Sequence, residues 1–174
     1  MIPITDSITE LTILQPDDWH LHLRDDQALA TTVPHAASSF NRVICMPNLV
    51  PPVKNTNDAR AYRERILQQL QISDIPKERK AAFDPRMTLY MTDQTSVQDI
   101  EAAAQSGIVQ AVKLYPAGAT TNSADGVTDI NARADIFEAM EKHNLPLLIH
   151  GEVTHDHVDI FDREKRFLEE VMGQ

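Results

Sequence analysis

The amino-acid sequence predicts an α/β fold with about five parallel strands and flanking helices. Short apolar runs that mostly lack charge alternate along the chain with longer amphipathic stretches. Uncharged runs of Val, Ile, Leu and Met are typical of strands that are covered on both faces, as in a parallel sheet. The strand–helix alternation therefore indicates parallel neighbours joined by right-handed crossovers.

The expected strands share this apolar character and are residues 19–23, 42–46, 87–91, 109–114 and 145–149. Helices are expected where apolar residues recur at helical spacing, at 57–71, between Ser96 and Gly107, at 131–143 and at 162–172. The remaining polar segments are expected to be loops, at 48–57, 73–84 and 116–129. A closed (β/α)₈ barrel needs eight strands and about 250 residues, so the sheet is either open or part of a longer barrel.

Composition limits the function classes. The chain has 174 residues, which predicts a single domain over 1–174. Its 16 basic and 26 acidic residues give a net charge of -10, which argues against nucleic-acid and anionic-membrane partners but not against small anionic substrates. One cysteine excludes a disulfide framework. Because no apolar run reaches the roughly 18 residues of a membrane span and residues 1–6 lack signal-peptide features, we expect a cytoplasmic protein.

The first motif with chemical content lies in the first expected strand. Alternation along a strand would place His20, His22 and Arg24 on one face. Two imidazoles at this spacing stand roughly 6–7 Å apart, which is close enough to share one metal ion. The alternative is a pair of hydrogen-bonded core histidines, but the neighbouring arginine favours metal binding.

Three further residues fall at the ends of other expected strands. Lys113 interrupts an apolar strand, where it is either a snorkelling side chain or a buried amine kept neutral by its surroundings. His150 follows a run of aliphatic residues, and Asn48 follows the second strand, where it is either a turn residue or a substrate ligand. Because active sites of parallel barrels lie at the carboxyl ends of strands, we expect these side chains to share one site.

With these motifs the sequence resembles a known family. Residues 19–25, 46–48, 113–122 and 150–164 are similar, in this order, to the N-terminal half of the single-function bacterial dihydroorotases. This family belongs to the amidohydrolase superfamily of metal-dependent TIM barrels. The resemblance runs from about Gln15 to the end of the chain, and it implies the N-terminal portion of a (β/α)₈ barrel that is incomplete in this chain.

The resemblance implies a centre of two zinc ions. His20 and His22 would bind the more buried zinc, and His150 would bind the second. Lys113 would be carboxylated by carbon dioxide, and its carbamate would bridge both ions. A neutral amine in a dry site can take up carbon dioxide, which replaces a costly buried cation by an anion.

The resemblance also implies a substrate and a reaction. Arg24 and Asn48 would hold a substrate carboxylate, and Thr120 and Thr121 would belong to a mobile lid. The implied reaction is the reversible cyclisation of N-carbamoyl-L-aspartate to L-dihydroorotate in pyrimidine biosynthesis. The partner would be a small molecule rather than nucleic acid or membrane, and the complete enzyme is expected to be a homodimer.

No catalytic residue is assigned within this chain. The remaining histidine ligand and the catalytic aspartate of the family are expected beyond Gln174, so we expect the 174-residue chain alone to be inactive. Two alternatives stay open. One is another cyclic amidohydrolase of the hydantoinase or allantoinase type, although Trp19 and the Pro47–Asn48 pair favour dihydroorotase. The other is a non-catalytic half-barrel.

Overall fold

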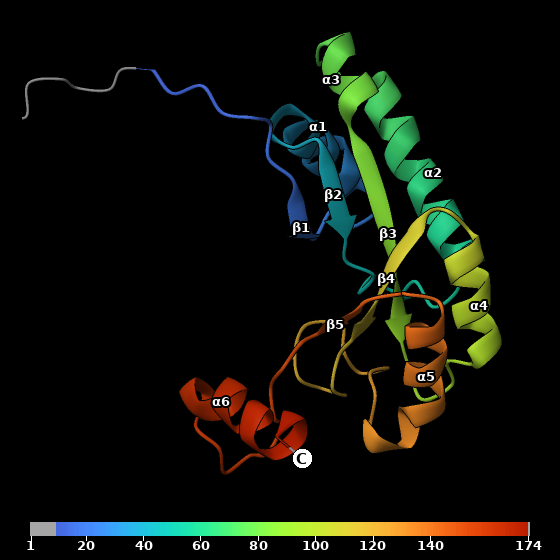
Figure 1. The fold of residues 1–174 in the computed structure, drawn as a ribbon. Coiled ribbons are helices and arrows are strands. Elements are labelled where there is room, and N and C mark those ends of the chain that lie inside the picture. The colour runs from blue at the N-terminus through green and yellow to red at the C-terminus, as the bar shows by residue number, and fades with distance from the viewer. Residues whose placement is uncertain (1–9, 174) are drawn as a thin grey trace, which may run out of the picture.

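A computed structural model describes residues 10–173 and contains one parallel sheet (Figure 1). The five strands follow one another across the sheet in sequence order and are β1 Asp18–Leu21, β2 Arg42–Cys45, β3 Asp84–Met91, β4 Val109–Leu114 and β5 Leu147–Ile149. All four pairings are parallel. The predicted α/β half-barrel, an incomplete barrel of five parallel strands, is therefore confirmed. The N-terminal residues 1–6, for which we expect no signal peptide, lie outside the described residues.

Within residues 10–173, five of the six α-helices cover one face of this sheet, and the last along the chain lies apart from them (Figure 1). Their bounds are α1 Leu29–Ser39, α2 Thr56–Ile72, α3 Lys77–Ala82, α4 Val97–Gln105, α5 Ala134–Lys142 and α6 Arg163–Phe167. Figure 1 shows α2 and α4 running along the same side of β3 and β4. Short 3₁₀ turns precede α1, α5 and α6. Among the described residues, no helix has the length and apolar character needed to cross a bilayer.

The central strands divide their side chains between two environments. Leu89 on β3 and Val112 on β4 join the apolar core that the helices cover. Tyr90 and Lys113, which are opposite each other in the register of β3 and β4, are buried but do not belong to that core. Since successive residues of a strand face opposite ways, Lys113 is directed to the face that the helices leave uncovered.

Helix α1 is an element that the sequence pattern did not predict. It contains Pro34 and two β-branched threonines, which are poor helix formers. Nevertheless Leu29 and Val33 are buried at helical spacing. Burial of this apolar stripe against the sheet outweighs the weak intrinsic propensity of the segment.

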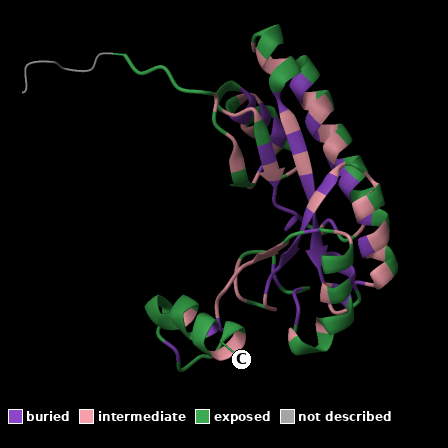
Figure 2. Ribbon diagram, in the orientation of Figure 1, coloured by how far each residue is buried: buried purple, intermediate pink, exposed green. Residues whose placement is uncertain are grey.

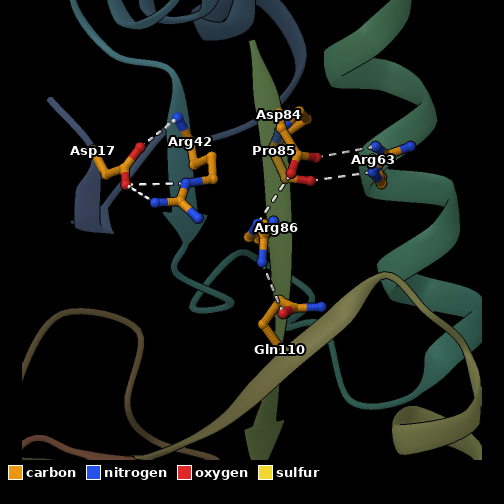
Figure 3. Close-up of polar contacts among 7 residues, drawn as sticks. All are labelled: Asp17, Arg42, Arg63, Asp84, Pro85, Arg86 and Gln110. Atoms are coloured by element: carbon orange, nitrogen blue, oxygen red, sulfur yellow. Dashed lines mark hydrogen bonds and ion pairs between the residues drawn. The ribbon is translucent and has the colours of Figure 1, made fainter. Parts of the chain in front are cut away.

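The segment 73–84, expected to be a charged loop, contains α3 and the first residue of β3, so the loop prediction was wrong. Asp84, at the end of this segment, pairs with Arg63 of α2 and Arg86 of β3 (Figure 3). Asp84 accepts a hydrogen bond from Arg86 at 3.0 Å, and Arg63 donates to the Pro85 carbonyl at 3.1 Å. Because these contacts compensate the charges, a charged sequence can begin a sheet strand.

The same polar network fastens the amino ends of the strands. Arg42 at the start of β2 donates hydrogen bonds to Asp17, which precedes β1, and Arg86 of β3 donates to Gln110 of β4 at 3.1 Å (Figure 3). These contacts span four neighbouring strands at one end of the sheet. The carboxyl ends of the strands, at the opposite edge of the sheet, are not part of these contacts.

The predicted C-terminal helix 162–172 is divided in the structure. The α-helical part ends at Phe167, and Leu168–Met172 forms a π-helical turn. Phe167 is buried, whereas most of the neighbouring surface is exposed (Figure 2). A single buried aromatic ring thus anchors this segment.

A core substitution tests the importance of the sheet. Leu89 has no exposed surface, so Leu89→Ala is expected to lower the free energy of unfolding by about 2–5 kcal/mol. The matched control is Leu14→Ala, at a leucine that is 94% exposed, with an expected change below about 0.5 kcal/mol. Urea unfolding followed by circular dichroism measures both, and equal effects would contradict this description of the core.

Candidate functional site

The predicted site residues lie at one rim of the sheet. His20 is on β1 and His22 directly follows it, Lys113 lies near the end of β4, and His150 is the first residue after β5. Because all strands are parallel, these positions belong to the same, carboxyl end of the sheet.

The two histidines of the first strand lie beside each other. Their ring centroids are 5.2 Å apart. Partial burial lowers the pKa of both imidazoles, and the positive charge of Lys113 lowers the pKa of each further. Both rings therefore favour the neutral form, which is the form that binds metal ions.

Lys113 is a buried amine without an anion. Its residue is 2% exposed, and among residues 10–173 its Nζ has neither an ion pair nor a hydrogen bond. The Nζ lies 5.3 Å from the centroid of the Tyr115 ring, which gives it only a cation–π contact. Burial lowers the pKa of this lysine, so the neutral, nucleophilic amine forms more readily here than in an exposed lysine.

His150 approaches the same tyrosine from the next strand. Its ring centroid is 6.0 Å from that of Tyr115. Its Nε2 lies 2.9 Å from Oε1 of Glu152, but the orientation does not allow a hydrogen bond, so this buried nitrogen has no donor or acceptor partner among the described residues. The charge of His150 also influences His20 on β1, which shows that the two strands contribute to one electrostatic environment.

Tyr115 is a residue of this site that the sequence reasoning missed. Its ring contacts both Lys113 and His150 and stacks on Tyr90 with centroids 5.0 Å apart. Its hydroxyl is buried and makes no hydrogen bond to any described residue, and burial raises the pKa of that hydroxyl. The available signal was its position two residues after Lys113, because residues at that spacing share a strand face.

Arg24 does not lie on the strand as predicted. Strand β1 ends at Leu21, and Arg24 has a left-handed backbone with φ of 60°. The hydroxyl of Tyr62 donates to the Arg24 carbonyl at 2.6 Å, and Asp25 forms an ion pair with Arg65 at 2.5 Å. These contacts hold the turn, and the positive charge of Arg24 lowers the pKa of His22.

Asn48, Thr120 and Thr121 are brought together. Asn48 is 3% exposed, and its Nδ2 donates to the Thr121 carbonyl at 3.1 Å. Its side chain also interacts with the imidazole of His22, where a hydrogen bond to Asn48 partly opposes the fall in the pKa of that histidine. The Thr120 amide donates to Oγ of Ser123 at 2.8 Å, so the expected lid is a folded turn in contact with Asn48.

The donor chemistry of this rim fits zinc in part. Imidazole nitrogen is a common zinc ligand, and His22 and His150 each have a buried ring nitrogen at this rim, the first beside Asn48 and the second beside Glu152. However, within residues 10–173 no group of three or more His, Cys, Asp or Glu side chains is close enough to hold a metal ion. A zinc centre would therefore depend on Lys113, whose ammonium form repels a cation and whose carboxylated form would be an anionic ligand.

Comparisons with known proteins agree on one family. The model of the amidohydrolase family matches residues 16–173. The chain is 58% identical over 166 residues to a dihydroorotase of Acinetobacter baumannii, which covers 95% of this chain and 46% of the relative. The chain thus spans about half the length of the curated relatives that it matches.

Solved structures give the same result. The fold matches a dihydroorotase from Campylobacter jejuni with a TM-score of 0.76 and 38% identity, over 89% of this chain and 42% of that one. It also matches a dihydroorotase from Saccharomyces cerevisiae in complex with 5-fluoroorotic acid, with a TM-score of 0.76 and 29% identity, over 88% of this chain and 42% of that one.

The buried lysine predicts a pH dependence of stability. Because the pKa of Lys113 is lower in the folded than in the unfolded chain, unfolding takes up a proton between these two pKa values. The free energy of unfolding should therefore rise with pH through that interval, up to the ordinary lysine value of 10.5. Lys113→Met should remove this rise and increase stability at neutral pH, because methionine carries no amine to be desolvated on folding.

Urea unfolding between neutral and alkaline pH, in buffer free of carbon dioxide, measures the effect. Lys142→Met, at an exposed lysine of α5, is the control and should keep the slope of the unmodified chain. Equal slopes for the unmodified chain and Lys113→Met would show that the Lys113 amine is not desolvated.

Proposed function

The chain belongs to the amidohydrolase family, and from this premise we propose that it forms the metal- and substrate-binding half of a dihydroorotase active site. The proposed reaction is the reversible cyclisation of N-carbamoyl-L-aspartate to L-dihydroorotate. The observation that carries the proposal is the buried Lys113 amine, which has no anionic partner among the described residues and lies at the same rim as histidines of β1 and β5.

The proposed metal ligands are the four residues of this rim. His20 and His22 would hold one zinc ion, His150 the other, and carboxylated Lys113 both. When bound, zinc would polarise the amide carbonyl of the substrate and make water a stronger nucleophile. The lowered pKa values of His20 and His22 support this assignment, because they keep imidazole lone pairs available at neutral pH.

Carboxylation is a chemically reasonable reaction of Lys113. The neutral Nζ attacks the carbon of carbon dioxide, a nitrogen–carbon bond forms, and one proton leaves the nitrogen for solvent. The product is a carbamate with one negative charge. The step first requires a neutral amine, which burial favours by lowering the pKa of Lys113. The carbamate would then be stabilised by cations bound to the nearby histidines.

Arg24 and Asn48 would orient the substrate carboxylate. A guanidinium can form two parallel hydrogen bonds to a carboxylate, and such geometry fixes which end of the substrate faces the metal ions. Asn48 uses one Nδ2 hydrogen for Thr121 and retains a second. The orotic-acid analogue bound by the yeast relative carries a carboxylate on a pyrimidine ring, which supports this class of ligand.

Thr120 and Thr121 would close over the bound substrate and exclude water. The family aspartate that would carry the proton is not among the residues assigned here, so the site described is incomplete for turnover. A cytoplasmic location and a homodimeric complete enzyme remain part of the proposal. The net charge of -10 is compatible with a small anionic substrate because Arg24 and bound metal ions make the site locally positive.

Zinc binding tests the metal assignment. His20→Ala and His22→Ala should each weaken zinc binding at least about tenfold, since even residues that only orient a ligand change metal affinity by roughly 10–100-fold. His35→Ala, at an exposed histidine of α1, is the matched control and should leave zinc binding unchanged. Elemental analysis after zinc loading and dialysis measures retention, and equal zinc content in all four chains would refute the assignment.

Ligand binding tests the substrate class. L-dihydroorotate should bind the zinc-loaded chain more tightly than hydantoin, which lacks the carboxylate. Arg24→Gln should weaken dihydroorotate binding by about 10–100-fold, because a hydrogen bond to a charged group contributes roughly 1.5–3 kcal/mol. Arg60→Gln, at an exposed arginine of α2, is the control for isothermal titration. Tighter binding of hydantoin would favour the alternative type of cyclic amidohydrolase.

A further inference from the structure

The turn after β4 is connected by two side-chain hydrogen bonds to the turn after β2 and by a third to β3. Asn48 Nδ2 donates to the Thr121 carbonyl at 3.1 Å, and Asn122 Nδ2 donates to the Asn48 carbonyl at 3.0 Å. The hydroxyl of Tyr90, on β3, donates to the Asn122 carbonyl at 3.2 Å. Each bond joins residues that are far apart in the sequence, so only the tertiary structure brings them together.

The two asparagines contact each other reciprocally. Each uses its amide nitrogen to donate to a main-chain carbonyl of the opposite turn. Asn122 has a left-handed backbone with φ of 56°, a conformation that asparagine tolerates better than most residues. We define the latch as Asn48, Asn122 and Tyr90 together with these three hydrogen bonds.

The turn held by the latch is itself rigid. Ser123 is buried, and its hydroxyl donates to the Thr120 carbonyl at 2.6 Å while accepting a hydrogen bond from the Thr120 amide. The Gly118 amide donates to the Ser123 carbonyl at 3.0 Å. These bonds connect residues 118–123 to one another, and the latch adds contacts from this turn to β3 and to the turn after β2.

Tyr90 connects the latch to the buried rim. Its ring stacks on Tyr115, which in turn contacts Lys113 and His150. The hydroxyl at the other end of the Tyr90 ring holds Asn122. Tyr90 therefore connects the turn to the aromatic stack that contacts the lysine.

We propose that Asn122 and Tyr90 are positioning residues that latch residues 118–123 in the closed position over the site. The importance of this closure for substrate rests on the proposed function, because Thr120 and Thr121 are its substrate-contacting residues. Asn48 belongs both to the latch and to the proposed substrate ligands. The side-chain amide of Asn48 therefore couples the position of the turn to the orientation of the substrate.

Amide hydrogen exchange of the 174-residue chain tests the latch without any ligand. Asn122→Asp keeps the size and the tolerance for a left-handed backbone but replaces the Nδ2 donor by an acceptor. Tyr90→Phe removes only the hydroxyl. Each variant should speed exchange of the amides of residues 118–123 by about fivefold, the effect of losing one hydrogen bond.

The matched control is Asn144→Asp, which makes the same chemical change at an exposed asparagine with φ of 51°, outside the latch. It should leave exchange in residues 118–123 unchanged. Exchange of the β3 and β4 amides in the same samples should stay equal in all chains, which shows that every variant is folded.

Two results would overturn the latch. One is exchange in residues 118–123 that is the same in Asn122→Asp, Tyr90→Phe and the control, and the other is fully unprotected exchange of these amides in the unmodified chain. A second arm adds L-dihydroorotate to the zinc-loaded chain. If the latch variants respond as expected but the ligand gives no added protection, the latch stands and the proposed function fails.

Discussion

Desolvation of Lys113 is the constraint on which the site depends. The lysine lies on β4, between β3 and β5, where its residue is 2% exposed and no described carboxylate forms an ion pair with it. A cation in this position is costly, so burial lowers the pKa of the amine, and the anion formed by carboxylation would need bound cations beside it. The same burial that would destabilise an ordinary lysine prepares this one for chemistry.

The two ends of the sheet have different roles. At the amino ends, arginines and aspartates pair with one another and fasten neighbouring strands. At the carboxyl ends, the buried hydroxyl of Tyr115 has no hydrogen-bond partner among the described residues, and Asn48, His22 and His150 bring polar side chains to the same rim. Paired charges are typical of a structural end, whereas histidines and a lysine gathered at a rim indicate a place for ligands.

Some of the site could be predicted because its signals are local. A lysine within an apolar strand and a histidine after another conflict with their surroundings, and strand parallelism then places them at one rim. Tyr115 was missed because an aromatic residue in a strand is ordinary, and its role follows only from its contacts with Lys113 and His150. The position of Arg24 was wrong because alternation ends where the strand ends, at Leu21.

The sequence by itself determined the number of strands, their parallel order and the residue types at their carboxyl ends. Apolar runs, and the polar residues that interrupt or follow them, can be recognised within short segments. Only the tertiary structure decided that α1 forms despite Pro34, that the charged segment 77–82 is helical, and that Asn48 meets Asn122. These outcomes depend on burial and on contacts between segments distant in the chain, which no local pattern encodes.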